Sequence, residues 1–152
     1  MEYIEAPKYW GGEGQSLFIA GGITDCPDWQ KDLIEHLKDT GLVLLNPRRR
    51  TFNTERLSES ADQIKWEHLH LKKADAVSFW FPKETLCPIT LYELGTWSAK
   101  GKKIFVGVHP EYRRRKDVEV QTALARPDVT VVYDIKELSK QIKNWAKQPT
   151  SD

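Results

Sequence analysis

Cysteine is scarce in this chain. Cys26 and Cys87 are the only two among its 152 residues, which excludes a disulfide framework of the kind that holds small secreted domains together. No CxxC pair and no Cys/His cluster has the spacing of a zinc site. We therefore expect no bound metal, and a reducing cytoplasm as the protein's location.

The chain also lacks a surplus of one charge and any long apolar run. Its 23 basic and 22 acidic residues leave a formal net charge of +1, whereas binding to polymeric nucleic acid requires a basic surplus on one face. Residues 1–14 lack the charged-then-apolar layout of a signal peptide, and no apolar run approaches transmembrane length. We expect neither polymeric nucleic acid nor a membrane as a partner.

Two phosphate-binding motifs are missing as well. Neither GxGxxG nor GxxxxGK[ST] occurs, so a dinucleotide site or a P-loop is unsupported. Six tryptophans, by contrast, are many for a chain of about one domain's length. Tryptophans line binding clefts, form subunit interfaces or fill cores, and the composition leaves these three alternatives open.

Short apolar runs alternate with segments of helical periodicity. The runs predict strands at 16–20, 42–45, 76–81, 104–108 and 129–133. The periodic segments predict helices at 28–40, 60–73, 89–100, 118–125 and 135–145, and Ser60 with Gln63 has the spacing of a capping box. These elements form one predicted domain at 16–146, which contains a polar loop at 51–59. We predict a polar N-terminal tail or edge segment at 1–15 and a C-terminal tail at 147–152.

This alternation predicts an α/β fold built on a parallel sheet with helices on both faces. Five such strands in one domain fit a doubly wound, flavodoxin-like sheet, with strand order 2-1-3-4-5 when strands are numbered along the chain. Ligands bind beyond the carboxyl ends of the strands, where the order reverses between strands 1 and 3. The loops that meet there are 21–28 and 82–88, so topology alone indicates Gly21, Gly22 and the helix that starts near Pro88.

Glu93 lies near the start of the helix that faces this reversal, within Leu91-Tyr92-Glu93-Leu94-Gly95. A carboxylate there could attack an anomeric carbon or hold a water that does so, because a nearby anion stabilises the oxocarbenium-like state of glycosidic cleavage. Thr90-x-x-Glu93 is also a capping-box spacing, in which Glu93 would only bind a backbone N–H. Local spacing by itself favours the cap.

Several other residues have both a functional and a structural interpretation. Glu67 borders the apolar side of its helix and could reach a sugar hydroxyl or a base, although a surface glutamate is favoured by spacing alone. The Gly21-Gly22 turn allows close approach of a ligand to the backbone, or is simply a tight turn. Arginines 48–50 and 113–115 suit a phosphate or form solvated loops, and His109 is an acid–base group or a structural residue.

Specific segments of the chain resemble the nucleoside 2-deoxyribosyltransferase-like superfamily over roughly 16–138. The most specific is Pro88-Ile89-Thr90-Leu91-Tyr92-Glu93-Leu94-Gly95, and the others are Phe18-Ile19-Ala20-Gly21-Gly22-Ile23, Cys26-Pro27-Asp28-Trp29-Gln30, Leu45-Asn46-Pro47-Arg48-Arg49, Trp66-Glu67 before Ala74-Asp75-Ala76, and Phe81-Pro82.

The resemblance implies roles for these residues. It makes Glu93 the nucleophile that takes the deoxyribosyl group, which reverses the preference for a cap, and it places Glu67 near the base and the sugar. The matched segments supply the expected substrate-binding residues, which are Gly21, Gly22, Ile23, Asp28, Pro47, Arg48, Trp66, Phe81 and Gly95. Phe18 stands where the transferases carry a tyrosine that binds the catalytic glutamate. This departure counts against base exchange and leaves hydrolysis open, as in the related deoxynucleoside-monophosphate N-glycosidases.

The resemblance thus implies an enzyme that cleaves the N-glycosidic bond of a nucleoside or nucleotide. It implies no metal or organic cofactor, and assembly into a homodimer or a larger homo-oligomer. A non-catalytic nucleotide-binding module on the same fold is the alternative, favoured by the loss of the first-strand tyrosine. An interaction protein that uses its tryptophans and basic triplets is a third possibility, and it predicts no defined cleft.

Overall fold

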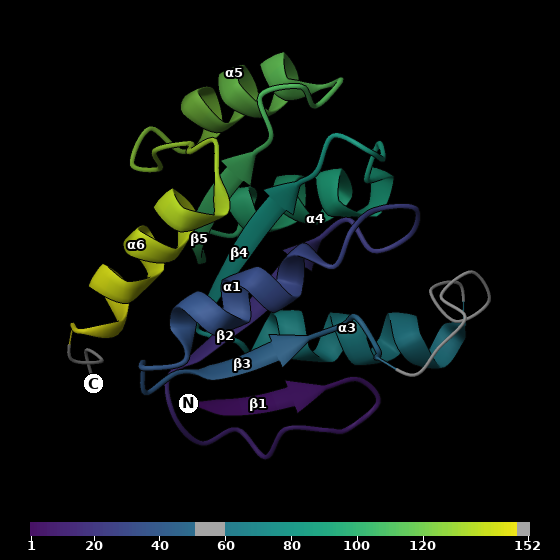
Figure 1. The fold of residues 1–152 in the computed structure, drawn as a ribbon, viewed down its shortest axis with the longest axis vertical. Coiled ribbons are helices and arrows are strands. Elements are labelled where there is room, and N and C mark those ends of the chain that lie inside the picture. Colours follow the sequence, from purple (N-terminus) through teal and green to yellow (C-terminus); the bar gives the residue numbers. More distant parts are fainter. Residues whose placement is uncertain (51–59, 149–152) are drawn as a thin grey trace.

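The computed structural model describes residues 1–50 and 60–148, and these build a parallel sheet between two layers of helices (Figure 1). In the sheet, the strands are β1 (Glu2–Glu5), β2 (Ser16–Gly21), β3 (Val43–Asn46), β4 (Ala76–Phe81) and β5 (Lys103–Val108). Their order is β1-β3-β2-β4-β5, and every neighbouring pair is parallel. The predicted α/β, flavodoxin-like fold class is confirmed.

The first four predicted strands correspond to β2, β3, β4 and β5, and they lie in the predicted relative order. The fifth strand of the sheet comes from the N-terminal segment, which forms the edge strand β1 beside β3. Residues 129–133, predicted as a strand, contribute a single parallel bridge between Gly107 and Val132. Val129 and Val131 are only partly buried against the core, so little apolar surface holds this segment along β5.

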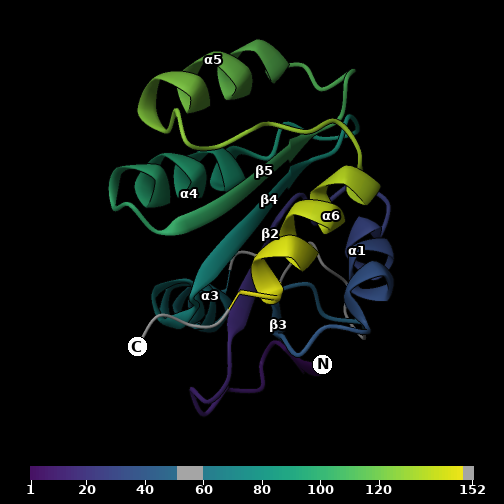
Figure 2. The same cartoon turned by 90° about the vertical axis from the view of Figure 1, so that its left-hand side faces the viewer.

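Five helices lie within the described residues: α1 (Trp29–Leu37), α3 (Ala61–Lys73), α4 (Pro88–Ala99), α5 (Arg115–Ala125) and α6 (Ile135–Ala146). Figure 2 shows α1 and α6 on one side of the sheet and α3, α4 and α5 on the other. The two apolar clusters agree with this arrangement. Leu17 and Ile19 of β2 pack with α1 and α6, whereas Phe18 and Ala20 pack with α3 and α4.

The N-terminal caps of α3 and α4 differ in how well the sequence predicts them. Ser60 caps α3 by accepting a hydrogen bond from the Gln63 backbone N–H, so the predicted Ser60–Gln63 spacing does mark that start. At α4 the cap is Cys87, in a left-handed conformation with φ of 50° and without a side-chain hydrogen bond. The Thr90–Glu93 pair is therefore not the N-terminal cap of α4, and Glu93 is available for another role.

Two further findings concern the limits of the fold. The polar loop predicted at 51–59 lies outside the described residues. Among the helices that are described, none is both long enough and apolar enough to cross a membrane.

Candidate active site

The site is built at the carboxyl edge of the sheet, where the strand order reverses between β2 and β4. The β2–α1 loop and the β4–α4 loop meet at this point. A Cβ added to Gly22 would lie 2.8 Å from Pro82 Cγ and 3.0 Å from Cys87 Sγ, which shows how closely the two loops pack. The two loops that topology predicts to meet at the reversal point are therefore in contact.

Glu67 and Glu93 come from different helices to the same side of the sheet. Glu67 lies on α3 and Glu93 on α4, and both side chains are partly buried. Burial and, to a smaller extent, the negative charge of nearby Glu67 together raise the pKa of Glu93 to about 8. Two acids that repel each other in a partly dry site hold one proton between them near neutral pH, which is the arrangement that acid–base chemistry uses.

The Glu67 carboxylate is held in place by the buried side chain of Gln63. Gln63 Nε2 donates to Glu67 Oε1 at 2.9 Å and to the carbonyl oxygen of Pro47 at 3.0 Å, while Arg49 Nε donates to Gln63 Oε1 at 2.8 Å. Burial raises the pKa of Glu67, and the Gln63 hydrogen bond and the Arg49 charge oppose this rise. Arg49, Gln63 and Pro47 thus orient one carboxylate of the pair.

Gln63 and Arg49 were not predicted as site residues. Gln63 lies four residues before Glu67 on α3, so a helical spacing places the two side chains side by side, and this signal was available in the sequence. Arg49 was noted as part of a basic triplet and of a segment that resembles the family, without a role of its own.

The Gly21-Gly22 turn is closely packed, although Gly21 stays partly exposed. Trp29 Nε1 and Gln30 Nε2, both on α1, donate to the Gly22 carbonyl oxygen at 2.8 Å and 3.0 Å. A Cβ at Gly21 would lie 2.3 Å from the Trp29 ring. Glycine is required here by packing, which supports the interpretation as a tight turn. Ile23, which follows, is partly buried.

Arg48 and Asp28 lie on the α1 side of the sheet. The Arg48 guanidinium donates to the carbonyl oxygens of Cys26 and Pro27 and to Gln30 Oε1, at 3.1, 2.9 and 3.0 Å, and so fixes the β2–α1 loop to the end of β3. Asp28 caps α1 by accepting from the Lys31 backbone N–H. Both residues line a cavity that contains neither Glu67 nor Glu93 in its described lining.

The other predicted binding residues lie apart from the carboxylate pair or in the core. Trp66 is 1% exposed, stacks on His70 and donates its indole N–H to the Lys8 carbonyl oxygen. Phe81 is fully buried beside Tyr112. Gly95 is exposed, and within the described part of the chain no atom lies within 4 Å of an added Cβ. Two residues along a helix span about 200°, so Gly95 and Glu93 point in nearly opposite directions.

The remaining candidates have local partners. His109 Nδ1 accepts from the Glu111 backbone N–H at 3.0 Å, which fits a structural histidine at the end of β5. Burial raises the pKa of the Cys26 and Cys87 thiols, that of Cys87 to about 12, which opposes a thiolate nucleophile. Within 1–50 and 60–148, no cluster of three or more His, Cys, Asp or Glu side chains has the geometry of a metal site.

The chain is similar to one family of known proteins. A family model described as nucleoside 2-deoxyribosyltransferase like matches residues 14–112, more than half of the chain. The match includes β2, the whole of α3 and α4, and therefore both glutamates. None of the curated proteins compared with the chain matches it.

Proposed function

The chain belongs to the nucleoside 2-deoxyribosyltransferase-like family, and on that premise we propose that it cleaves the N-glycosidic bond of a (deoxy)nucleoside or nucleoside 5′-monophosphate. The sugar then passes to water or to another base. The observation that supports the proposal is the pair of partly buried acids, Glu67 and Glu93, which lie on separate helices and repel each other electrostatically. The protein is accordingly an enzyme that acts on a small molecule.

In this proposal Glu93 is the nucleophile. Its carboxylate attacks C1′ of the sugar as the C1′–N bond to the base breaks, and the electron pair of that bond leaves with the base. Burial strengthens the attraction between the carboxylate and the positive charge that develops on the sugar, because little water screens it. Water or a second base then attacks C1′ and releases Glu93.

Glu67 supplies the proton. The raised pKa of Glu93 means that the pair still holds one proton near neutral pH. For attack, that proton must reside on Glu67, which then donates it to the departing base. The Gln63 and Arg49 contacts fix the orientation of Glu67 during this transfer.

The substrate-binding residues complete the proposal. We assign the sugar or phosphate seat to the Gly21-Gly22 turn with Ile23, because this turn borders the same reversal point. The binding roles of Asp28, Pro47, Arg48, Trp66, Phe81 and Gly95 stay predictions, as do the homo-oligomeric state and the cytoplasmic location. The process needs no metal or organic cofactor.

A non-catalytic nucleotide-binding module on the same fold is the second candidate. It is favoured by Phe18, whose ring is 1% exposed and packs against Trp66, and which brings no hydroxyl group toward the acids. Such a module would bind a nucleotide at the same edge of the sheet and leave it intact.

Release of free base separates the two candidates. The protein is incubated with a panel of nucleosides and 5′-monophosphates, and free base is measured by chromatography, together with Glu93→Gln and with Glu35→Gln as the matched control. Glu35 is an exposed acid on α1, across the sheet. We expect release by the wild type and by Glu35→Gln only. Release that persists in Glu93→Gln removes Glu93 from its role, and no release from any panel member favours the binding module.

A further inference from the structure

A second feature at the carboxyl edge of the sheet is not explained by N-glycosidic cleavage. It is a cavity of about 310 Å³ on the α1 side, which we call the basic cavity. Its lining residues are Tyr3, Asp28, Lys31, Ile34, Asn46, Arg48, Arg49 and Arg50. A volume of this size is at the lower end of the range for small-molecule sites.

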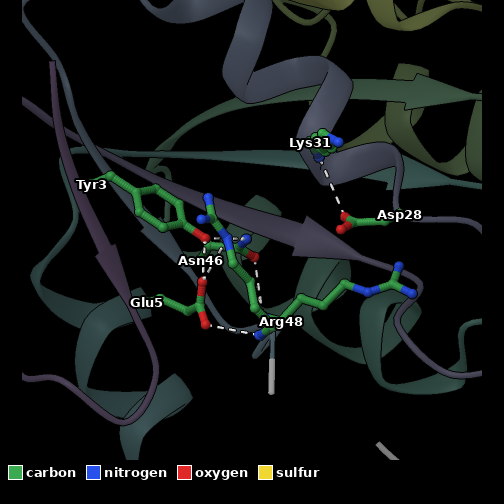
Figure 3. A network of polar contacts seen from close by, with 7 residues as sticks. Tyr3, Glu5, Asp28, Lys31, Asn46 and Arg48 are labelled. Atoms are coloured by element: carbon green, nitrogen blue, oxygen red, sulfur yellow. Dashed lines mark hydrogen bonds and ion pairs between the residues drawn. The ribbon is translucent and has the colours of Figure 1, made fainter. Parts of the chain in front are cut away.

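The floor of the basic cavity is a fixed network rather than a loose surface. Asn46 Nδ2 donates to the Tyr3 hydroxyl at 3.1 Å, and that hydroxyl donates to Glu5 Oε2 at 2.7 Å (Figure 3). Glu5 Oε1 also accepts from the Arg50 backbone N–H at 2.8 Å, and the Arg50 guanidinium lies over the Tyr3 ring. These contacts join β1, β3 and the segment that follows β3, so the cavity keeps its shape without a ligand.

Among the described lining residues positive charge dominates, with four basic side chains and one acidic side chain. Arg48 donates to three uncharged oxygens, so its positive charge persists. Asp28 is engaged by the Lys31 backbone N–H (Figure 3). Among the described residues, no carboxylate forms an ion pair with the Lys31 ammonium. The exposed Arg50 side chain forms an ion pair with Glu5 at 3.4 Å.

The basic cavity and the acid pair lie on opposite sides of the sheet. Along β3, Val43 and Leu45 pack into the cluster with α3 and α4, so Asn46 points to the α1 side, where Tyr3 of β1 joins it. Glu67 and Glu93 belong to α3 and α4, on the other side. Arg49 connects the two regions, because it lines the cavity and donates to the Gln63 side chain that holds Glu67.

We propose that the basic cavity binds a phosphate group, present as inorganic phosphate or carried by a small phosphomonoester, at a site separate from Glu67 and Glu93. The Lys31 ammonium and the Arg50 guanidinium contact the phosphate oxygens, since cationic donors form the strongest hydrogen bonds to such anions. Ile34 and the Tyr3 ring provide an apolar wall for the organic part of a phosphomonoester.

The test is a titration of the isotope-labelled full-length protein followed by amide chemical shifts. The probes are inorganic phosphate and ribose 5-phosphate, which has no N-glycosidic bond to cleave, with sodium chloride at matched ionic strength as the control. We expect saturable shifts at the amides of Tyr3, Lys31 and Asn46. Equal affinity for both probes identifies inorganic phosphate as the sufficient ligand, whereas tighter binding of ribose 5-phosphate identifies a phosphomonoester.

Two variants test whether the phosphate binds in the basic cavity. Lys31→Ala and Arg50→Ala should each weaken binding about tenfold, the effect of losing one hydrogen bond to a charged group. Lys116→Ala, which removes an exposed lysine on α5, should bind like the wild type, and Lys31→Ala should keep the wild-type rate of base release. The proposal would be overturned if both cavity variants bound with unchanged affinity, or if millimolar probe gave no saturation. It would also be overturned if the saturable shifts were confined to the amides of Gly21, Gly22, Glu67 and Glu93.

Discussion

The two faces of the sheet differ in the charge of the side chains that lie over them. On the α3–α4 side, Glu67 and Glu93 share a partly buried position, and burial raises the pKa of both. On the α1 side, four cations surround an open cavity whose floor is formed by uncharged and paired groups. Desolvation destabilises the acids as anions, whereas Lys31 and Arg50 of the cavity are exposed to water. The first region is suited to reaction with a developing cation, and the second to holding an anion.

The largest effect should come from removing the nucleophile. Glu93→Gln keeps the size of the side chain and removes its ability to attack C1′, so kcat for base release should fall on the order of 10⁴-fold. The measurement is chromatography of free base with the substrate that the wild type cleaves. A loss of less than tenfold would mean that the acid side of the sheet does not contain the reacting group.

Removing the proton donor should have a smaller effect. Glu67→Gln should lower kcat by roughly 10²- to 10³-fold, the usual contribution of general acid catalysis. A 7-methylguanine nucleoside is the control substrate, because its base leaves as a neutral molecule without being protonated. That substrate should restore much of the rate to Glu67→Gln and little to Glu93→Gln, and equal rescue of both variants would contradict the division of roles.

The pH dependence should report the shared proton. The active form of the pair holds one proton, and the pKa of Glu93 is about 8, so kcat/KM should fall about tenfold per pH unit above this value. In Glu67→Gln the donor is absent, and this fall at high pH should disappear. A wild-type kcat/KM that instead rises through pH 8 would show that Glu93 only needs to be ionised and that Glu67 donates no proton.

Glu93→Gln, which should lower activity, should increase the stability of the folded chain at high pH. A carboxyl group with a raised folded-state pKa binds its proton more tightly in the folded than in the unfolded chain, so its stability contribution is lost as pH rises from the unfolded value toward about 8. Glu93→Gln should therefore raise the free energy of unfolding at pH 8, by on the order of 2 kcal/mol. Urea denaturation at pH 5 and pH 8 measures this, with Glu35→Gln as the control. An equal change at both pH values would contradict the burial of the acid.

Most of the fold could be predicted from the sequence, because a short, continuous apolar run between turn residues has few stable structures other than a buried strand. Four strands and the helices between them were predicted from runs that stop at glycine or proline. The N-terminal segment was predicted as a tail or an edge segment, without a strand at Glu2–Glu5, since Ile4 is the one fully buried side chain of β1 and its place depends on distant partners, including Asn46 of β3. Residues 129–133 were predicted as a strand from their apolar run, but they pair with the sheet through a single bridge.

The site was predicted less completely than the fold. Topology and the family resemblance both indicated Glu93, although local spacing favoured a helix cap, and the structure assigns that cap to Cys87. The contacts of Gln63 with Arg49 and Pro47 join α3 to the segment that follows β3, so no local pattern reveals them. Trp66 and Phe81 stand in segments that resemble the family, yet their rings fill the core.

The account depends most on Glu93 forming a bond to the sugar, and peptide mapping after rapid acid quench tests this directly. The protein is mixed with the substrate that it cleaves, quenched during turnover, digested and analysed by mass spectrometry. We predict a glycosyl group attached to the Glu93 carboxyl oxygen in wild type and none in Glu93→Gln. A glycosyl group on another residue, or rapid base release with unmodified Glu93 at every quench time, would contradict its role as the nucleophile.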